Sequence, residues 1–167
     1  TISHACHDWK EFCINDAVSA IDKHVVDYRF DLYVKTLYKL VWNQFCDIYL
    51  EALKSVTDEE STLKARQFFI VVLKLCHPIM PFITEALGVQ FGSDLLITSV
   101  WPKSLEVNSN EHAQFQTVLD LCQNIKFIKS TLDMKEKITV SYTGPHQNIV
   151  VWHHTYIQQA CHVVFGE

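Results

Sequence analysis

Apolar residues recur at spacings of three and four along most of the first hundred positions, which is the pattern of amphipathic helices. The first series begins beyond Asp8, a residue type that can cap a helix. Its apolar members are Trp9, Phe12, Cys13, Ala17, Ala20 and Ile21. They predict a first helix over residues 8–24, followed by a connection around Tyr28.

A second, longer helix is predicted from Asp31, as its cap, to Ser55. Trp42 and Leu53 widen its apolar arc beyond what a surface helix needs. We therefore expect this helix to lie centrally and to pack on more than one side, with Trp42 buried at the centre of a bundle. The apolar positions assigned to its buried face are Val34, Leu37, Tyr38, Val41, Phe45, Ile48, Tyr49 and Ala52.

A third helix is predicted to begin at the Thr-Asp-Glu-Glu sequence of residues 57–60, which has the form of a capping box, and to run to Cys76. Pro78 cannot continue this helix, because proline lacks the amide hydrogen and disfavours a helical conformation at the preceding residue. Pro81 can occupy the first turn of a short helix to Leu87. The sequence thus predicts two helices separated by a His-Pro junction.

The last third of the chain predicts a long helix and a small α/β appendage. The helical pattern resumes at residue 109 after a linker-like stretch. Two short apolar runs, at 138–142 and 148–152, flank a Thr-Gly-Pro-His turn and predict a β-hairpin. Residues 155–163 predict a last helix.

The composition agrees with a compact, mainly helical fold. The chain has 167 residues, of which 49% are hydrophobic and 20% charged, with only four glycines and four prolines. These values suit a globular domain and exclude a disordered chain. The predicted fold class is mainly α: a helical bundle over residues 1–108, followed by a long helix and a short hairpin over residues 109–167 that belong to the same structural unit.

The charge of the chain limits how it could contact a nucleic acid. The formal net charge is −5, and the first 60 residues carry the excess, with 6 Lys and Arg against 11 Asp and Glu. A freestanding nucleic-acid-binding protein is usually basic, so any RNA contact here must use a local patch. Two lysine pairs at helical spacing could form one: Lys35 with Lys39, and Lys126 with Lys129. For the first pair, a solvated helix face beside acidic neighbours remains the alternative.

No catalytic or metal-binding motif stands out. The sequence contains no Gly-x-Gly-x-x-Gly, no P-loop and no Gly-x-Ser-x-Gly. His4, Cys6, His7 and Cys13 are residue types that bind zinc, but they lack a Cys-x-x-Cys pair and a second pair of ligands downstream. We therefore expect neither a metal site nor a catalytic residue.

The remaining compositional features suit a cytoplasmic protein. The longest uninterrupted apolar run, Phe68–Leu73, is too short to cross a membrane, and no signal peptide is visible. The six cysteines stand in apolar contexts without a framework spacing, which fits a reducing compartment. We expect no membrane association.

Two motifs and their order along the chain indicate a family. A Trp-x-x-Phe-Cys-Asp-x-Tyr-Leu-Glu segment occupies residues 42–51, and a His-Pro-x-Met-Pro-Phe-Ile-Thr-Glu segment occupies residues 77–85. A Trp-Pro pair follows at 101–102, and then a helix with Lys126 and Lys129 ahead of a short strand. In this order the chain resembles the helical anticodon-binding domain of class I aminoacyl-tRNA synthetases, and most closely that of the valyl enzymes.

The resemblance implies a domain that binds the anticodon stem-loop of tRNA(Val) and positions the tRNA for ATP-dependent attachment of valine by the rest of a parent synthetase. The catalytic signatures of that class are absent from this sequence, so we expect ATP to serve the parent enzyme and no cofactor to bind here. Anticodon loops are single-stranded and are bound by stacking on aromatic rings and by phosphate contacts. The residues expected to contact tRNA phosphate are Lys35, Lys39, Lys126 and Lys129, in a monomer.

A second function stays open from the sequence alone. The acidic N-terminal part would also suit a helical scaffold that binds protein partners and has lost its affinity for tRNA. One concave face that combines clustered lysines with an exposed aromatic ring would favour RNA binding over this alternative.

Overall fold

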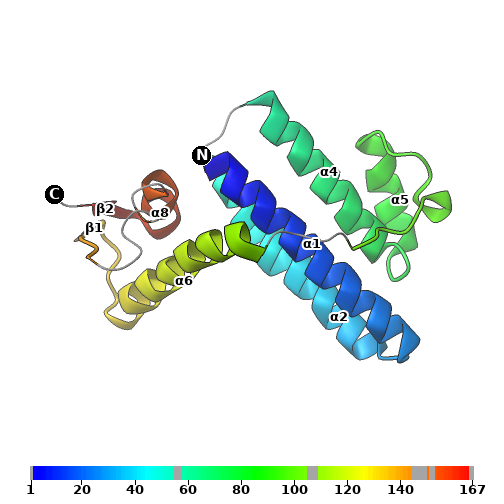
Figure 1. Ribbon diagram of the computed structural model, residues 1–167, viewed down its shortest axis with the longest axis horizontal. Coiled ribbons are helices and arrows are strands. Elements are labelled where there is room, and N and C mark those ends of the chain that lie inside the picture. The colour runs from blue at the N-terminus through cyan, green and yellow to red at the C-terminus, as the bar shows by residue number, and fades with distance from the viewer. Residues whose placement is uncertain (1, 55–57, 105–108, 144–149, 151–152, 166–167) are drawn as a thin grey trace. The chain divides into compact units, whose positions relative to one another are not determined.

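The computed structural model describes residues 2–54, 58–104, 109–143, 150 and 153–165. It is mostly helical, with a small two-stranded sheet near the C-terminus, which confirms the predicted fold class (Figure 1). Two compact units make up the chain: a larger one over Lys10–Val107, and a smaller one formed by Thr1–Trp9 together with Asn108–Glu167. Each unit is described by itself.

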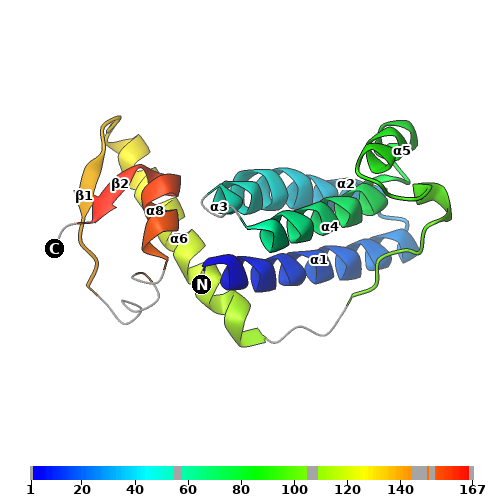
Figure 2. The same cartoon turned by 90° about the horizontal axis from the view of Figure 1, so that it is seen from above.

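The larger unit is a bundle in which α1, α2 and α4 run side by side (Figures 1 and 2). Its elements are α1 (Ile2–Val26, which begins in the smaller unit), α2 (Phe30–Tyr38), the π-helix η1 (Lys39–Tyr49), α3 (Leu50–Leu53), α4 (Glu59–Cys76), α5 (Pro81–Gln90) and the 3₁₀ turn η2 (Leu96–Thr98). The segments α2, η1 and α3 follow one another without a break and correspond to the predicted second helix.

The starts of the first two helices differ from the predicted caps. α1 begins at Ile2, six residues before Asp8, so Asp8 lies inside the helix. α2 begins at Phe30, which places Asp31 in its first turn, where the Asp31 carboxylate accepts hydrogen bonds from Arg29 Nε and Nη2 at 2.9 Å each. The hydrogen-bonded Arg29 guanidinium lowers the pKa of Asp31 to about 2. α4 starts where it was predicted to start, but its cap is Asp58, whose side chain accepts from Ser61 N at 2.7 Å; Thr57, the first residue of the predicted capping box, lies outside the described residues.

The prediction that Trp42 is buried at the bundle centre is wrong, because its side chain is 57% exposed. The helix from Phe30 to Leu53 carries two apolar stripes, and periodicity alone does not say which of them faces the core. The buried stripe consists of Tyr33, Leu37, Leu40, Phe45, Tyr49 and Ala52, and the exposed one contains Val34, Tyr38 and Trp42. The Tyr33 hydroxyl, which donates to Leu75 O at 2.7 Å in a buried site, helps to fix the orientation.

The π-helix changes the spacing of the buried positions. The buried residues advance by five from Leu40 to Phe45, where an α-helix would advance by three or four. The Leu50 amide bonds to Phe45 O, five residues back, which is the hydrogen-bond pattern of a π-helix. The wider turn brings Phe45 and Tyr49 onto the core side.

Aromatic packing joins η1 to α4. The Phe68 ring lies edge-on to Phe45 and Tyr49, with ring centroids 5.1 and 5.0 Å apart, and Phe69 stacks on Phe45 at 5.6 Å. Phe45, Tyr49 and Phe68 are all buried. Such edge-to-face pairs stabilise by about 0.5–1.5 kcal/mol beyond the burial of their area.

The His-Pro junction is held by polar contacts. α4 ends at Cys76 and α5 begins with Pro81 in its first turn, as predicted. The His77 ring approaches Thr84 Oγ1 at 2.8 Å, and Thr84 Oγ1 donates to Met80 O at 2.8 Å. The Glu85 carboxylate accepts the Leu96 amide at 3.0 Å, which ties η2 to α5.

The smaller unit packs α6 (Ser109–Thr131) against α8 (His154–Cys161) beside strands β1 (Ile138–Val140) and β2 (Val163–Phe165). The strands are parallel, with Ile138 opposite Val163. The second strand of the predicted hairpin, 148–152, lies outside the described residues except for Val150, and β1 pairs with β2 instead. A parallel pair needs a long connection, which here includes α8.

The connection between α1 and α2 places Tyr28 in a left-handed conformation, with φ of 54°. The Arg29 amide reaches back to His24 O at 2.8 Å and the Tyr28 amide to Val25 O at 3.2 Å, which is a Schellman closure. Glycine is the usual residue at this position because it has no Cβ. The Tyr28 side chain is exposed, and its ring lies edge-on to the Phe30 ring, with the two ring centroids 6.5 Å apart.

We predict that Phe68→Ala destabilises the larger unit by about 3–5 kcal/mol, because a large ring is lost from a closed aromatic cluster. Trp42→Ala, at a half-exposed site, is the matched control and should cost no more than about 1 kcal/mol. Urea unfolding of both variants measures the two free energies. Equal losses would contradict the placement of the two rings.

We predict that Tyr28→Gly is more stable than Tyr28→Ala by about 1 kcal/mol, since both remove the ring and only glycine relieves the left-handed backbone. The comparison of the two variants in thermal unfolding isolates the backbone contribution. A less stable glycine variant would mean that the helix does not end in this conformation.

Candidate nucleic-acid interface

Two stacked aromatic rings and two lysines share one surface of α2 and η1. Lys35, Tyr38, Lys39 and Trp42 stand three or four residues apart and are therefore neighbours on the helix. The rings of Tyr38 and Trp42 stack at a centroid distance of 6.3 Å and an interplanar angle of 11°, and both are more than half exposed. We call these four residues the aromatic–lysine face. Flat exposed rings beside cations suit single-stranded nucleic acid, whose bases stack and whose phosphates need positive charge.

The two lysines of this face differ in their surroundings. Lys39 Nζ pairs with Asp16 Oδ2 at 3.2 Å, with both side chains about half exposed. An exposed pair of this kind contributes little stability, so a phosphate could replace the carboxylate. Lys35 is exposed and has no ion pair within 4.0 Å in the described part of the chain, although its charge helps to lower the pKa of Asp31.

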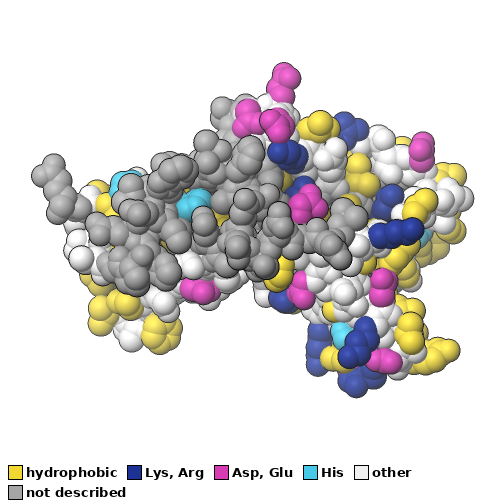
Figure 3. All heavy atoms as spheres, in the orientation of Figure 1, with side chains coloured by type: hydrophobic (Ala, Val, Ile, Leu, Met, Phe, Trp, Pro, Cys, Tyr) yellow, Lys and Arg dark blue, Asp and Glu magenta, His cyan; other side chains and the backbone are white. Residues whose placement is uncertain are grey.

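Further cations gather where α1 turns into α2. Figure 3 shows Lys and Arg side chains crowded over that end of the larger unit, with acidic and apolar side chains among them. Lys23 and Arg29 are exposed there, as is Tyr28. Arg29 is held by Asp31, however, so only part of this positive charge is available to a ligand. The aromatic–lysine face begins next to this cluster, at Lys35.

The start of α5 presents the most exposed large apolar side chain among the described residues, Phe82, at 91%. Ile79, Met80 and Ile83 beside it are also exposed. In the sequence, Phe82 was noted only as a member of the His-Pro motif, and its exposure was not predicted. The helical pattern did not predict this exposure, because Ile79 and Met80 precede α5 and Phe82 and Ile83 lie in its first turn.

The second predicted lysine pair lies on α6 in the smaller unit. Lys126 is exposed. Lys129 Nζ donates to Cys161 O at 3.3 Å and to His162 O at 3.1 Å, the carbonyls at the end of α8. A cation at a helix C-terminus interacts favourably with the helix dipole and satisfies carbonyls that have no amide partner. Lys129 therefore has a structural role that the sequence did not indicate.

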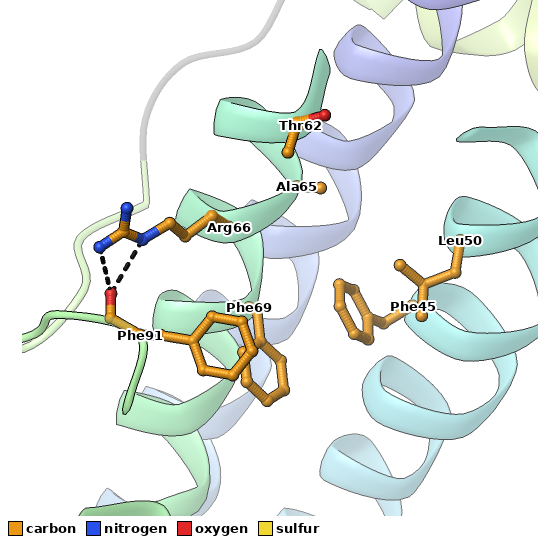
Figure 4. A pocket seen from close by; sticks show the side chains of 7 residues that line it. All are labelled: Phe45, Leu50, Thr62, Ala65, Arg66, Phe69 and Phe91. Carbon is orange, nitrogen blue, oxygen red and sulfur yellow. Dashed lines mark hydrogen bonds between the residues drawn. The ribbon is translucent and has the colours of Figure 1, made fainter. Parts of the chain in front are cut away.

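A cavity of about 420 Å³ opens between η1 and α4 (Figure 4). It is lined by Phe45, Leu50, Thr62, Ala65, Arg66, Phe69 and Phe91, almost entirely through carbon atoms. The Arg66 guanidinium donates from Nε at 2.8 Å and from Nη2 at 2.5 Å to Phe91 O (Figure 4). Because the polar edges of a nucleobase need hydrogen-bond partners, this cavity is a poor site for a base and lies outside the candidate interface.

Metal-ligating side chains do not cluster in the described residues: no group of three or more His, Cys, Asp or Glu occurs among them. The side chains of His4 and His7, half of the zinc candidates weighed above, lie outside the described part. Cys6 and Cys13 are buried on α1. No helix in the part of the chain that the structure describes combines the length and hydropathy needed to cross a membrane.

Comparison with known proteins identifies the family to which the chain belongs. Residues 8–143 match the family described as the anticodon-binding domain of tRNA ligase. The valine–tRNA ligase of Petrotoga mobilis is 31% identical over 143 residues, covering 77% of this chain, and that of Zymomonas mobilis is 32% identical over 135 residues, covering 72%. The Granulibacter bethesdensis valine–tRNA ligase is 36% identical over 113 residues.

The match covers most of the chain, so the chain belongs to the anticodon-binding domains of tRNA ligases. Among these, its similar relatives are valine–tRNA ligases, and the chain spans only 16% of the length of the Petrotoga mobilis enzyme. The predicted family resemblance is confirmed. The assignment of phosphate contacts to four particular lysines stays a prediction.

We predict that Lys129→Ala weakens the smaller unit by about 1 kcal/mol, because two helix-end carbonyls lose a charged donor at a partly exposed site. Lys126→Ala, one turn away and exposed, is the control and should change stability by less than about 0.5 kcal/mol. Hydrogen exchange of the α8 amides measures the local opening free energy. Equal protection in the two variants would rule out the structural role of Lys129.

Proposed function

We propose that this domain binds the anticodon stem-loop of tRNA(Val) and positions the tRNA for attachment of valine by a parent valine–tRNA ligase. The observation that carries the proposal is the family match over residues 8–143 together with relatives named valine–tRNA ligase. The task of the domain in this proposal is recognition and positioning, and bond formation belongs to the parent's catalytic domain. Holding one end of the tRNA in place lowers the entropic barrier to reaction at the other end.

The parent enzyme in this proposal is an ATP-dependent ligase of the cytoplasm. ATP would activate valine in the catalytic part of the parent, and this domain would bind no cofactor of its own. We infer that the domain is a monomer whose partners are the tRNA and the rest of the synthetase.

In the proposed complex the lysines contact phosphate and the exposed rings stack on bases. The phosphate contacts are assigned to Lys35, Lys39, Lys126 and Lys129. Lys35 and Lys126 are exposed and can bind directly, whereas Lys39 must exchange Asp16 for a phosphate and Lys129 must leave its carbonyls. Tyr38 and Trp42 offer the stacking surface beside Lys35 and Lys39. The net charge of −5 keeps the affinity modest.

We predict weak, salt-sensitive binding of a tRNA(Val) anticodon stem-loop. With three or four phosphate contacts, log K should fall against log salt with a slope of about −2 to −3, taking roughly 0.7 per contact with single strands. Lys35→Ala and Lys126→Ala should each reduce the steepness by about 0.7 and weaken all RNAs alike, because phosphate contacts carry no sequence information. Fluorescence anisotropy at several salt concentrations measures these slopes.

Matched variants separate stacking from charge. Trp42→Ala should weaken binding by about 1–3 kcal/mol at every salt concentration and leave the slope unchanged. Lys54→Ala, an exposed lysine paired with Glu51, is the control for loss of one positive charge and should leave the slope as it is. Stem-loop binding that is absent, or equal for valine and unrelated anticodons, would overturn the proposal and favour the protein-binding scaffold.

A further inference from the structure

The cavity between η1 and α4 has the size of a small-molecule site. Its volume of about 420 Å³ lies within the range of such sites, about 300–1,000 Å³. All of its lining residues belong to the larger unit. An apolar cavity of about 150 Å³ is enough to bind benzene, so this one has room for a molecule of about two or three rings. One side chain inserted by a partner protein would occupy only a small part of this volume, which favours a small molecule as the occupant.

Three phenylalanine rings line the cavity and contact one another in series (Figure 4). The Phe69 ring stacks on Phe45, with centroids 5.6 Å apart and an interplanar angle of 18°, and meets Phe91 edge-on, at 4.8 Å and 66°. The rings come from three elements: η1, α4 and the residue that caps α5. Aromatic rings attract further rings in offset-stacked and edge-on arrangements, so a flat aromatic ligand gains contacts beyond the area it buries.

The polar side chains of the lining already have partners. Thr62 Oγ1 donates to Asp58 O at 3.3 Å, and the Arg66 guanidinium donates from two nitrogens to Phe91 O. Figure 4 shows this guanidinium directed toward Phe91 O and away from Phe45. A charged or strongly polar ligand would lose its water and find no free partner on the described walls of the cavity. The lining therefore selects an uncharged ligand.

The contact between Arg66 and Phe91 fixes the third ring in place. Gly92 follows Phe91 in a left-handed conformation, with φ of 64°, and a Cβ at this position would lie 2.5 Å from Arg66 Nη2. Glycine therefore allows the turn after α5 to close around the guanidinium. Because Phe91 is held by its own backbone carbonyl, its ring is positioned before a ligand arrives, and a preorganised site binds at a lower entropic cost.

We propose that this cavity is a binding site for an uncharged aromatic molecule of about two or three rings. The ligand contacts η1 through Phe45, α4 through Phe69 and the end of α5 through Phe91. π-Helical segments occur frequently at functional sites, and here η1 supplies one wall of the cavity. The three elements meet only in the folded bundle, so the ligand stabilises the larger unit. Binding at this site does not require the RNA-binding function proposed above.

The experiment titrates the native chain with N-phenyl-1-naphthylamine, an uncharged three-ring dye whose fluorescence rises in apolar surroundings. The expected result is a saturable rise in fluorescence with one dye per chain, and a thermal midpoint that increases with dye concentration. Naphthalene should displace the dye, whereas 2-naphthoate, which carries a carboxylate on the same two rings, should do so at least about tenfold less well. Fluorescence that does not saturate, or equal displacement by the two competitors, overturns the proposal.

Matched variants locate the dye. Ala65→Phe adds a ring inside the cavity and should weaken dye binding at least about tenfold, because a closely packed site has no room for both rings. Gln67→Phe adds the same ring at an exposed position of α4 outside the lining, and Phe82→Ser removes the exposed ring at the start of α5; both should keep the native affinity. Native affinity in Ala65→Phe, or its loss in Phe82→Ser, overturns the proposal. Circular dichroism checks folding, and if Ala65→Phe does not fold, the two competitors on the native chain decide.

Discussion

The contact between η1 and α4, in which Phe68 packs edge-on between Phe45 and Tyr49, is the constraint on which the larger unit depends. Only one of the two apolar stripes of the long second helix can face α4. Once Phe45 and Tyr49 are buried there, Tyr38 and Trp42 must face outward. The stacked pair available to a ligand is therefore a consequence of core packing. The same two helices also carry the apolar cavity that Phe45 and Phe69 line.

Charge then limits what the exposed surface can bind. The chain carries more acid than base, and several of its cations already have partners: Arg29 with Asp31, Lys39 with Asp16, and Lys129 with the carbonyls after α8. In the proposed complex such a surface offers few contacts to RNA, so a larger assembly would have to supply most of the affinity. This agrees with a chain that spans 16% of the length of a relative.

The sequence predicted the order of the helices, the start of α4 and the His-Pro junction, because each rests on local chemistry such as a capping side chain or a missing amide. The sequence-based predictions failed where contacts between helices decide which side chains are buried. Both stripes of the second helix are apolar, so only contacts with α4 decide that Phe45 is buried and Trp42 exposed. The positive charge of Lys126 and Lys129 could be read from the sequence, whereas the carbonyls that Lys129 binds at the end of α8 are more than thirty residues away in the chain. The partner of β1 was missed for the same reason.

The pairing of β1 with β2 also determines when each unit can form during synthesis. The larger unit is one continuous stretch, Lys10–Val107, and all of its contacts are available once that stretch has been made. The smaller unit combines the first residues of the chain with its last third, and Ile138 must wait for Val163 before its strand has a partner. Vectorial synthesis thus produces the bundle first, while Trp9, the last residue of α1 that belongs to the smaller unit, still lacks the Phe115 ring of α6 against which it packs. Until α6 has been made, the Trp9 ring, which is buried in the folded protein, stays exposed to solvent.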